Sequence, residues 1–192
     1  MFNRSVSLRG LVLLAGACAF SNAMWADGPE IVGFGGGATY SGGNGTHALF
    51  GGGASFGIGN NIRLLGEFTY SPLASATQSQ SGVTVSGSEH LIGFGGGIDY
   101  SFLDAKAKAR PYVTAVVGLD HDSASATGTG SSAGSIPSIS ISSNSAYIGF
   151  GGGLRYFIGK SWGIKPEVRY QHSPSFGNSV VYSVGLFYRF GD

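Results

Sequence analysis

GIKPEVRYQH, residues 163–172, decides the fold class of this chain. Its apolar side chains, Ile164, Pro166, Val168 and Tyr170, alternate with the polar side chains Lys165, Glu167, Arg169 and Gln171. Because successive side chains of a β-strand point to opposite faces, this stretch predicts a strand with one apolar and one charged face. The apolar face would meet either a second sheet or, in a closed membrane barrel, the lipid around a polar lumen.

The same alternation and a repeated motif run through the rest of the chain. IVGFGGGATY from Ile31 returns as LIGFGGGIDY from Leu91 and YIGFGGGLRY from Tyr147, spacings of 60 and 56 residues that recurring hairpin pairs would give. A shorter relative, LFGGGASF, begins at Leu49. We expect strands of about ten residues, the length of a tilted membrane strand. They fall near residues 31–40, 47–57, 62–71, 89–102, 110–120, 146–157, 163–172 and 179–190.

The connections between these strands differ in length. Compact turns follow the second, fourth and sixth strands, whereas residues 72–88 and 121–145, after the third and fifth, are long and rich in Ser, Thr and Gly. We expect the long segments to be flexible loops on one side of the molecule. The predicted fold is therefore all-β, an eight-stranded antiparallel up-and-down transmembrane β-barrel with short periplasmic turns and longer outer loops.

Aromatic residues favour this barrel over the main alternative, a soluble Gly-rich β-sandwich. Membrane interfaces select aromatic rings, which have an apolar body and often a polar edge. At the turn end we expect a belt of Phe56, Tyr100, Phe102, Tyr156, Tyr188 and Phe190. At the loop end we expect a belt of Tyr40, Tyr70, Tyr170 and Tyr182.

The N-terminus has the charge-then-apolar order of a secretory signal. Arg4 and Arg9 precede an apolar run over residues 11–20, which is shorter than the ~20 residues of a membrane-spanning anchor, the alternative interpretation. We expect a cleaved signal over residues 1–23, with an alternative end at 26, then a short lead over 24–30 and a barrel domain over 31–192. Export to the bacterial outer membrane follows from this organisation.

Composition excludes several classes of protein. The only cysteine, Cys18, lies in the predicted signal, so the mature chain has no disulfide, and lipidation at Cys18 would need a Leu-type residue where Ala15 stands. Without Arg4 and Arg9, nine basic side chains oppose ten acidic ones, which gives no indication of a nucleic-acid partner.

On these strands, and on the final SVGLFYRF, the chain resembles the small outer-membrane β-barrels related to the transmembrane domain of outer membrane protein A and the opacity-type porins. The resemblance implies partners in outer-membrane lipid, lipopolysaccharide and the assembly machinery that recognises an aromatic last strand. Tyr188 and Phe190 are the matching residues, although Gly191 and Asp192 follow them.

Charged residues at inward positions predict a lumen held by ion pairs. A narrow barrel cannot keep so many charges hydrated, so they must pair. Inward glycines of the repeated motif would leave room for the long arginines. The expected network is Arg63, Glu67, Asp99, Arg155, Lys165, Glu167, Arg169 and Arg189. Its excess of basic residues leaves open a narrow passive pore with a slight anion preference.

Histidines and glycines provide no catalytic or metal site that we would predict. His47, His90, His121 and His172 fall on the loop-end rim, where hydrophilic side chains are simply hydrated. His172 is similar in position to the catalytic histidine of lipid A deacylase barrels, but Pro174 occupies the place of their serine. The Gly clusters lack the Gly-Lys-Ser/Thr of a phosphate loop. We expect no enzyme, no cofactor and no metal.

The sequence thus predicts an integral outer-membrane protein with a structural role in envelope integrity. A porin-like channel and a surface adhesin remain the alternatives, and a lipid A-modifying enzyme is disfavoured.

Overall fold

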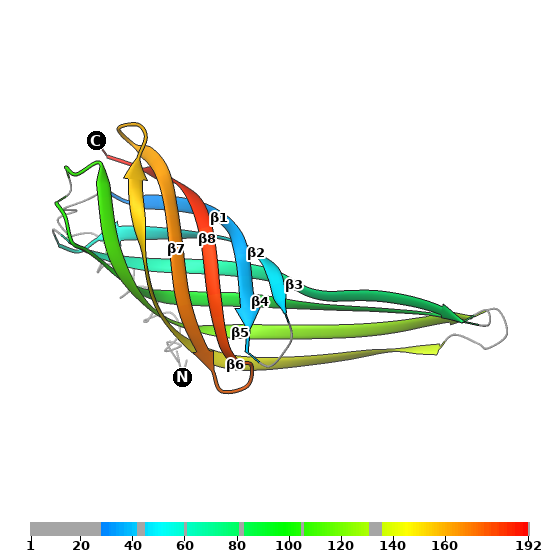
Figure 1. Ribbon diagram of the computed structural model, residues 1–192. Helices are drawn as coiled ribbons and strands as arrows, with labels where there is room; N and C mark the ends of the chain where they lie inside the picture. Colours follow the sequence, from blue (N-terminus) through cyan, green and yellow to red (C-terminus); the bar gives the residue numbers. More distant parts are fainter. Residues whose placement is uncertain are drawn as a thin grey trace, which may run out of the picture.

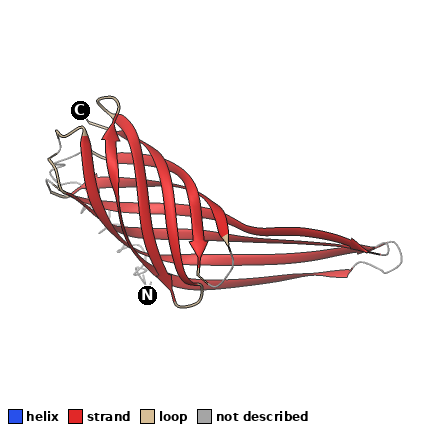
Figure 2. Ribbon diagram, in the orientation of Figure 1, coloured by secondary structure: helices blue, strands red, loops and turns tan. Residues whose placement is uncertain are grey.

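The computed structural model of the chain describes residues 28–41, 45–59, 61–80, 83–104, 106–130 and 136–191. The predicted signal peptide, its alternative end, Cys18 and most of the lead therefore lie outside the described residues. Among those described, none forms a helix long and apolar enough to cross a membrane. In Figure 2 the coloured parts of the chain are strands and loops, with no helix among them.

Eight antiparallel strands close into a barrel in the order β1-β2-β3-β4-β5-β6-β7-β8, with β1 paired to β8 (Figure 1). The predicted up-and-down topology is confirmed. The strands are β1 (Glu30–Tyr40), β2 (Thr46–Gly57), β3 (Ile62–Gln80), β4 (Val83–Ser101), β5 (Ala109–Gly130), β6 (Ile136–Phe157), β7 (Trp162–Ser173) and β8 (Gly177–Arg189).

Four strands are much longer than the sequence predicts. β3 to β6 continue past the barrel rim as a four-stranded sheet, which we call the β-arm: residues 72–80, 83–90, 122–130 and 136–146 (Figure 1). The prediction of flexible loops at 72–88 and 121–145 is therefore wrong for their described residues. Ladder pairing, with one irregularity between Pro72 and Ala74 and one between Ala126 and Gly128, holds these segments as strands.

Barrel side chains follow the predicted alternation. Val117, Phe150 and Leu186 lie on the outer surface, while Asp99 and Arg155 are buried inside. Outward apolar groups would meet lipid, and closure of the barrel gives each strand a hydrogen-bonded neighbour on both sides.

The first copy of the glycine motif is oriented opposite to the other two. In β4 and β6 the ninth residue of the motif, Asp99 or Arg155, faces inward, and the tenth faces outward. In β1 the ninth residue is Thr39, which faces outward and hydrogen-bonds Thr46 at 2.7 Å. Tyr40 therefore lies inside, packed against a buried cluster of Ala38, Leu49 and Val181, and its predicted place in the outer belt is wrong.

Candidate functional site

The barrel interior is crossed by side chains from opposite walls. Arg155 of β6, 1% exposed, lies between Glu30 at the start of β1 and Asp99 of β4. Its Nε donates to Glu30 Oε1 at 3.3 Å, and its Nη2 donates to Asp99 Oδ2. Lys165 Nζ of β7 lies 3.4 Å from the same Asp99 oxygen. These contacts tie distant strands together across the lumen.

A second group of ion pairs lies next to the first. Arg169 of β7 donates to both carboxylate oxygens of Glu67 on β3 and also to Glu167. Arg169 and Glu67 are each 8% exposed. Lys165 lies 3.6 Å from Glu167 and so joins the two groups into one network. Tyr112 Oη also joins this network, because it donates a hydrogen bond to Glu167 Oε2 at 2.6 Å.

Aromatic rings and guanidinium groups fill the turn end of the lumen. Phe157 and Phe187 are buried edge to face, with centroids 4.9 Å apart. The Arg110 and Arg189 guanidinium carbons lie 4.6 and 4.7 Å from the Phe157 ring centroid, within range of cation–π attraction. Arg155 stacks over Tyr112 at 4.6 Å in the same way. Apolar and charged groups therefore close this end together.

The structure places all eight predicted lumen residues on inward positions, in two different settings. Six of them form the carboxylate network described above: Glu67, Asp99, Arg155, Lys165, Glu167 and Arg169. Arg63, 3% exposed, donates to the Ser55 hydroxyl at 3.1 Å and to the Gly28 carbonyl at 2.9 Å. Arg189 lies at the turn end over Phe157.

Sequence reasoning missed Glu30, Arg110 and Tyr112. Glu30 directly precedes the predicted first strand, and Arg110 and Tyr112 occupy the same face of β5 as buried Thr114. Period two along β5 could have identified the last two. Glu30 adds an acidic side chain and Arg110 a basic one, so these two residues leave the basic excess of the predicted set unchanged.

Glycines of the motif make room for the interior side chains. A Cβ at Gly149 would lie 2.9 Å from Arg169 Cδ, and one at Gly153 would lie 2.6 Å from the Tyr112 hydroxyl. Gly95 faces Tyr147 in the same manner. The repeat therefore has a packing role, as the sequence suggested for the arginines, and it extends to the tyrosines.

Above the network the interior opens toward the arm. A cavity of about 60 Å³, lined among others by Phe34, Tyr147 and Val181, has room for a few water molecules. A recess of about 340 Å³ follows at the base of the arm, between Tyr40, Phe176 and Asp122. The described lumen thus has open space at its arm end and ion pairs and aromatic rings at its turn end.

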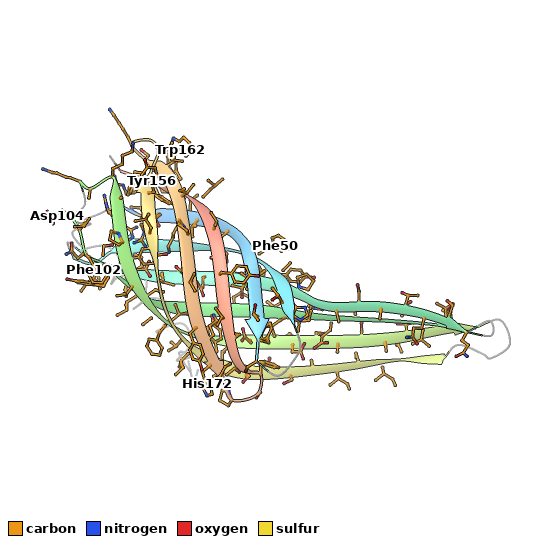
Figure 3. All side chains as sticks on the ribbon, in the orientation of Figure 1. Phe50, Phe102, Asp104, Tyr156, Trp162 and His172 are labelled. Atoms are coloured by element: carbon orange, nitrogen blue, oxygen red, sulfur yellow. The ribbon has the colours of Figure 1, made fainter. Side chains whose placement is uncertain are left out.

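The four histidines lie near the arm end but do not converge. His121 and His172 each hydrogen-bond an asparagine, Asn144 and Asn178, at 2.7 Å. His47 stacks near Tyr40 and His90 near Tyr70, with centroids 5.9 and 6.0 Å apart. Figure 3 labels His172 at this end of the barrel. In the described part of the chain, no three His, Cys, Asp or Glu residues are grouped to hold a metal ion.

The β-arm has two chemically different faces. Its outer face, the hydroxyl face, continues the outer surface of the barrel, and cross-strand hydroxyl pairs such as Ser79–Thr84 at 2.8 Å and Ser88–Ser125 at 3.1 Å run across it. Its paired members are Ser75, Thr77, Ser79, Thr84, Ser86, Ser88, Ser123, Ser125, Thr127, Thr129, Ser140 and Ser142. The other face, the apolar face, carries Ala74, Ala76, Val85, Gly87, Ala124, Ala126, Ile139 and Ile141, with Gln78 among them and Glu89 and Asp122 at its base.

No family model matches the chain, and no curated protein matches its sequence. Solved structures do match. Neisserial surface protein A (NspA) superposes with a TM-score of 0.62 at 18% identity, over 84% of this chain and 97% of that one. Ail, the attachment invasion locus protein of Yersinia pestis, gives 0.55 at 14% identity over 85% and 99%. The N-terminal β-barrel domain of Pseudomonas aeruginosa OprF gives 0.50 at 20% identity over 85% and 98%.

The fold is that of the small outer-membrane β-barrels. At the level of fold, this confirms the resemblance that the strands and the last segment indicated. The aromatic positions agree with such a barrel. Figure 3 places Phe102 and Tyr156 at the turn end, with Trp162 beside them. Tyr100, Tyr188 and Phe190 are also exposed on the outer surface, and the rings of Tyr188 and Phe190 lie 4.9 Å apart.

Proposed function

We propose that this protein is an integral outer-membrane anchor with a closed barrel, which contributes to envelope integrity and holds the β-arm outside the cell. The observation that carries the proposal is the Glu30–Arg155–Asp99 bridge, which spans the lumen between three strands. Buried charges in such a bridge are held in place because separating them would leave each one uncompensated.

The orientation follows from the fold. Small outer-membrane barrels have short turns on the periplasmic side and longer segments outside. Here the turns after β2, β4 and β6 are short, and the arm extends from the opposite end (Figure 1). The proposed contacts with lipid and lipopolysaccharide fall on the outer surface, and the proposed assembly signal comprises Tyr188 and Phe190.

A non-enzymatic role is supported by the contacts of His172, the strongest catalytic candidate in the sequence. The His172 ring is hydrogen-bonded to the Asn178 side chain, and the hydroxyl groups of Ser173 and Ser145 are hydrogen-bonded at 2.8 Å. A histidine without a carboxylate partner and an adjacent nucleophile is a weak base for acyl chemistry.

Conductance in planar bilayers tests the closed lumen. We expect the purified, folded protein to give no single-channel steps. As a positive control, a variant with Arg155→Ala and Asp99→Ala, which removes a charge pair together, should conduct if it still migrates as a heat-modifiable barrel. Regular steps from the wild-type protein would contradict the proposal and favour the porin-like alternative.

A surface adhesin is the second candidate, and the arm favours it. An ordered sheet that carries unpaired edges offers a defined binding surface, whereas flexible loops would lose conformational entropy on binding. Binding of the whole protein in vesicles to host-cell surface material, compared with an arm-deleted variant, tests this candidate.

A further inference from the structure

The two edges of the β-arm lack strand neighbours. Pairing of β6 with β7 begins at Ile148↔His172, so the described part of β6 before it is unpaired on that side. Pairing of β2 with β3 ends at Phe50↔Tyr70, which leaves the other edge of the arm open as well. Such edges present rows of backbone donors and acceptors that another strand can complete.

The two edges differ in their side chains. Each edge strand contains one proline, Pro72 in β3 and Pro137 in β6, and the ladder of each has one irregularity, so these two devices do not distinguish the edges. From Ser138 onward β6 has no proline, and its first charged residue is Arg155, inside the barrel. Ile139 and Ile141 on this edge are 62% and 69% exposed. The stretch from Ser138 to Ser142 is therefore an uncharged edge with exposed apolar side chains that another strand can cover.

The sequence of the β6 edge is complementary to itself. In an antiparallel pair of two β6 strands centred on Ser140, Ile139 of each copy lies opposite Ile141 of the other, and Ser138 lies opposite Ser142. The twofold axis of this pair is perpendicular to the sheet, so apolar face continues into apolar face. In a parallel pair the faces would be exchanged, and Ile would lie beside Ser. The amphipathic pattern thus selects the antiparallel arrangement.

An antiparallel pair joins arms that point in opposite directions. Arms on one membrane all project outward, so they meet in this way only when two membranes face each other. We propose that the β6 edge binds the β6 edge of a second copy of this chain on a facing outer membrane, and so mediates contact between cells. The proposal rests on the outward-directed arm of the proposed function. Each short pair is weak, and many pairs across two surfaces act together.

Vesicle aggregation tests the contact. Full-length protein inserted into preformed phosphatidylcholine vesicles exposes the arm outside, and we expect wild-type vesicles to aggregate. Ile141→Lys places like charges along the paired edges and should reduce aggregation to the level of protein-free vesicles. Gln78→Lys, the same charge change on the β3 edge, is the matched control and should aggregate as wild type. Unchanged aggregation of the Ile141→Lys vesicles would overturn the proposal.

Cysteine cross-linking tests the register. The only native cysteine is Cys18, in the predicted signal, so in variants of the mature protein the introduced cysteine is the only thiol that can form a disulfide. Vesicles carrying Ile139→Cys, mixed with vesicles carrying Ile141→Cys, should give a disulfide-linked dimer on mild oxidation. Either variant alone should give at least tenfold less dimer. Equal dimer from one variant alone indicates a parallel or random contact and refutes the proposed pairing.

Heat-modifiable migration and bilayer conductance separate the two levels of the argument. A folded, non-conducting protein whose vesicles stay dispersed refutes the β6 pairing and leaves the closed anchor intact. A conducting protein whose vesicles aggregate supports the β6 pairing and refutes the closed barrel. Aggregation that needs added serum or host-cell protein would identify a different partner and also overturn the self-pairing.

Discussion

The β-arm continues the strands β3 to β6 of the barrel, but the polarity of the two strand faces is reversed between the barrel and the arm. Along β5, the outward side chains Val117 and Leu119 of the barrel give way to Ser123 and Ser125 in the arm. On the inward side, Thr114 and Asp120 of the barrel are followed by Ala124 and Ala126 in the arm. Period two is unchanged, and only the surroundings differ. The outer surface is apolar where we place it in lipid and hydroxylated where we place it in water.

The largest effect is expected from breaking the interior bridge. Arg155→Ala leaves Glu30 and Asp99 buried without their shared cation, which costs about 3–5 kcal/mol. Equilibrium unfolding by urea in lipid vesicles measures this loss. Lys160→Ala at an exposed turn is the control and should leave stability unchanged. A loss below about 1 kcal/mol for Arg155→Ala would mean that the bridge does not hold the barrel.

The next effect compares one strand face inside and outside the membrane. Val117→Arg puts a charge on the exposed outer wall and should cost about 2–4 kcal/mol in a bilayer. Ser125→Arg, on the same side of β5 within the arm, should change stability by less than about 0.5 kcal/mol. The same unfolding assay applies. Equal costs at the two positions would show that the polarity inversion does not mark the membrane boundary.

A smaller effect concerns glycine. Gly153→Ala would place a methyl carbon against the Pro166 backbone carbonyl and 2.6 Å from the buried Tyr112 hydroxyl, and should cost about 1–3 kcal/mol through overpacking. Gly87→Ala in the arm meets its nearest atom, the Ser125 carbonyl, at an ordinary 3.6 Å and should be neutral or slightly stabilising. Thermal unfolding of both variants in detergent checks the contrast, which fails if Gly153→Ala is as stable as Gly87→Ala.

The smallest effect on the barrel is expected from removing the arm. Short Asn-Gly turns in place of residues 75–88 and 125–140 join the opposite residues Ala74 and Glu89, and Ala124 and Ile141. They should leave the unfolding free energy of the barrel within about 1 kcal/mol, because the paired network lies wholly inside the barrel. Heat-modifiable migration and urea unfolding provide the readout. A barrel that no longer folds would show that the arm is part of its core.

Much of the barrel could be predicted from alternation alone, because the facing of neighbouring residues is a local property of a strand. Asp99 and Arg155 were assigned to the lumen in this way. Tyr40 was placed wrongly because a shift of one residue exchanges the two faces of a strand, and nothing local fixed the facing of the first motif. The motif itself contains one signal of the difference. Its ninth residue is the uncharged Thr39 in the first copy and a charged residue in the other two, so this position of the first copy can face outward.

The strands of the arm, in contrast, could not be predicted from alternation. Alternation is visible in SASATGTG, residues 123–130, and in SISIS, residues 138–142, but their composition is also that of flexible loops. Short polar strands are ordered only when neighbours complete their hydrogen bonds, and those neighbours lie far away in the sequence.

The sequence by itself determined the strands, their number and the charged side of each barrel wall, because period two depends only on adjacent residues. Tertiary structure alone decided which charges meet, since Arg155 and Glu30 are separated by 125 residues and come together only when the barrel closes. It also decided that two predicted loops are one sheet. Pairing between strands is a non-local property, and it appears only in the folded chain.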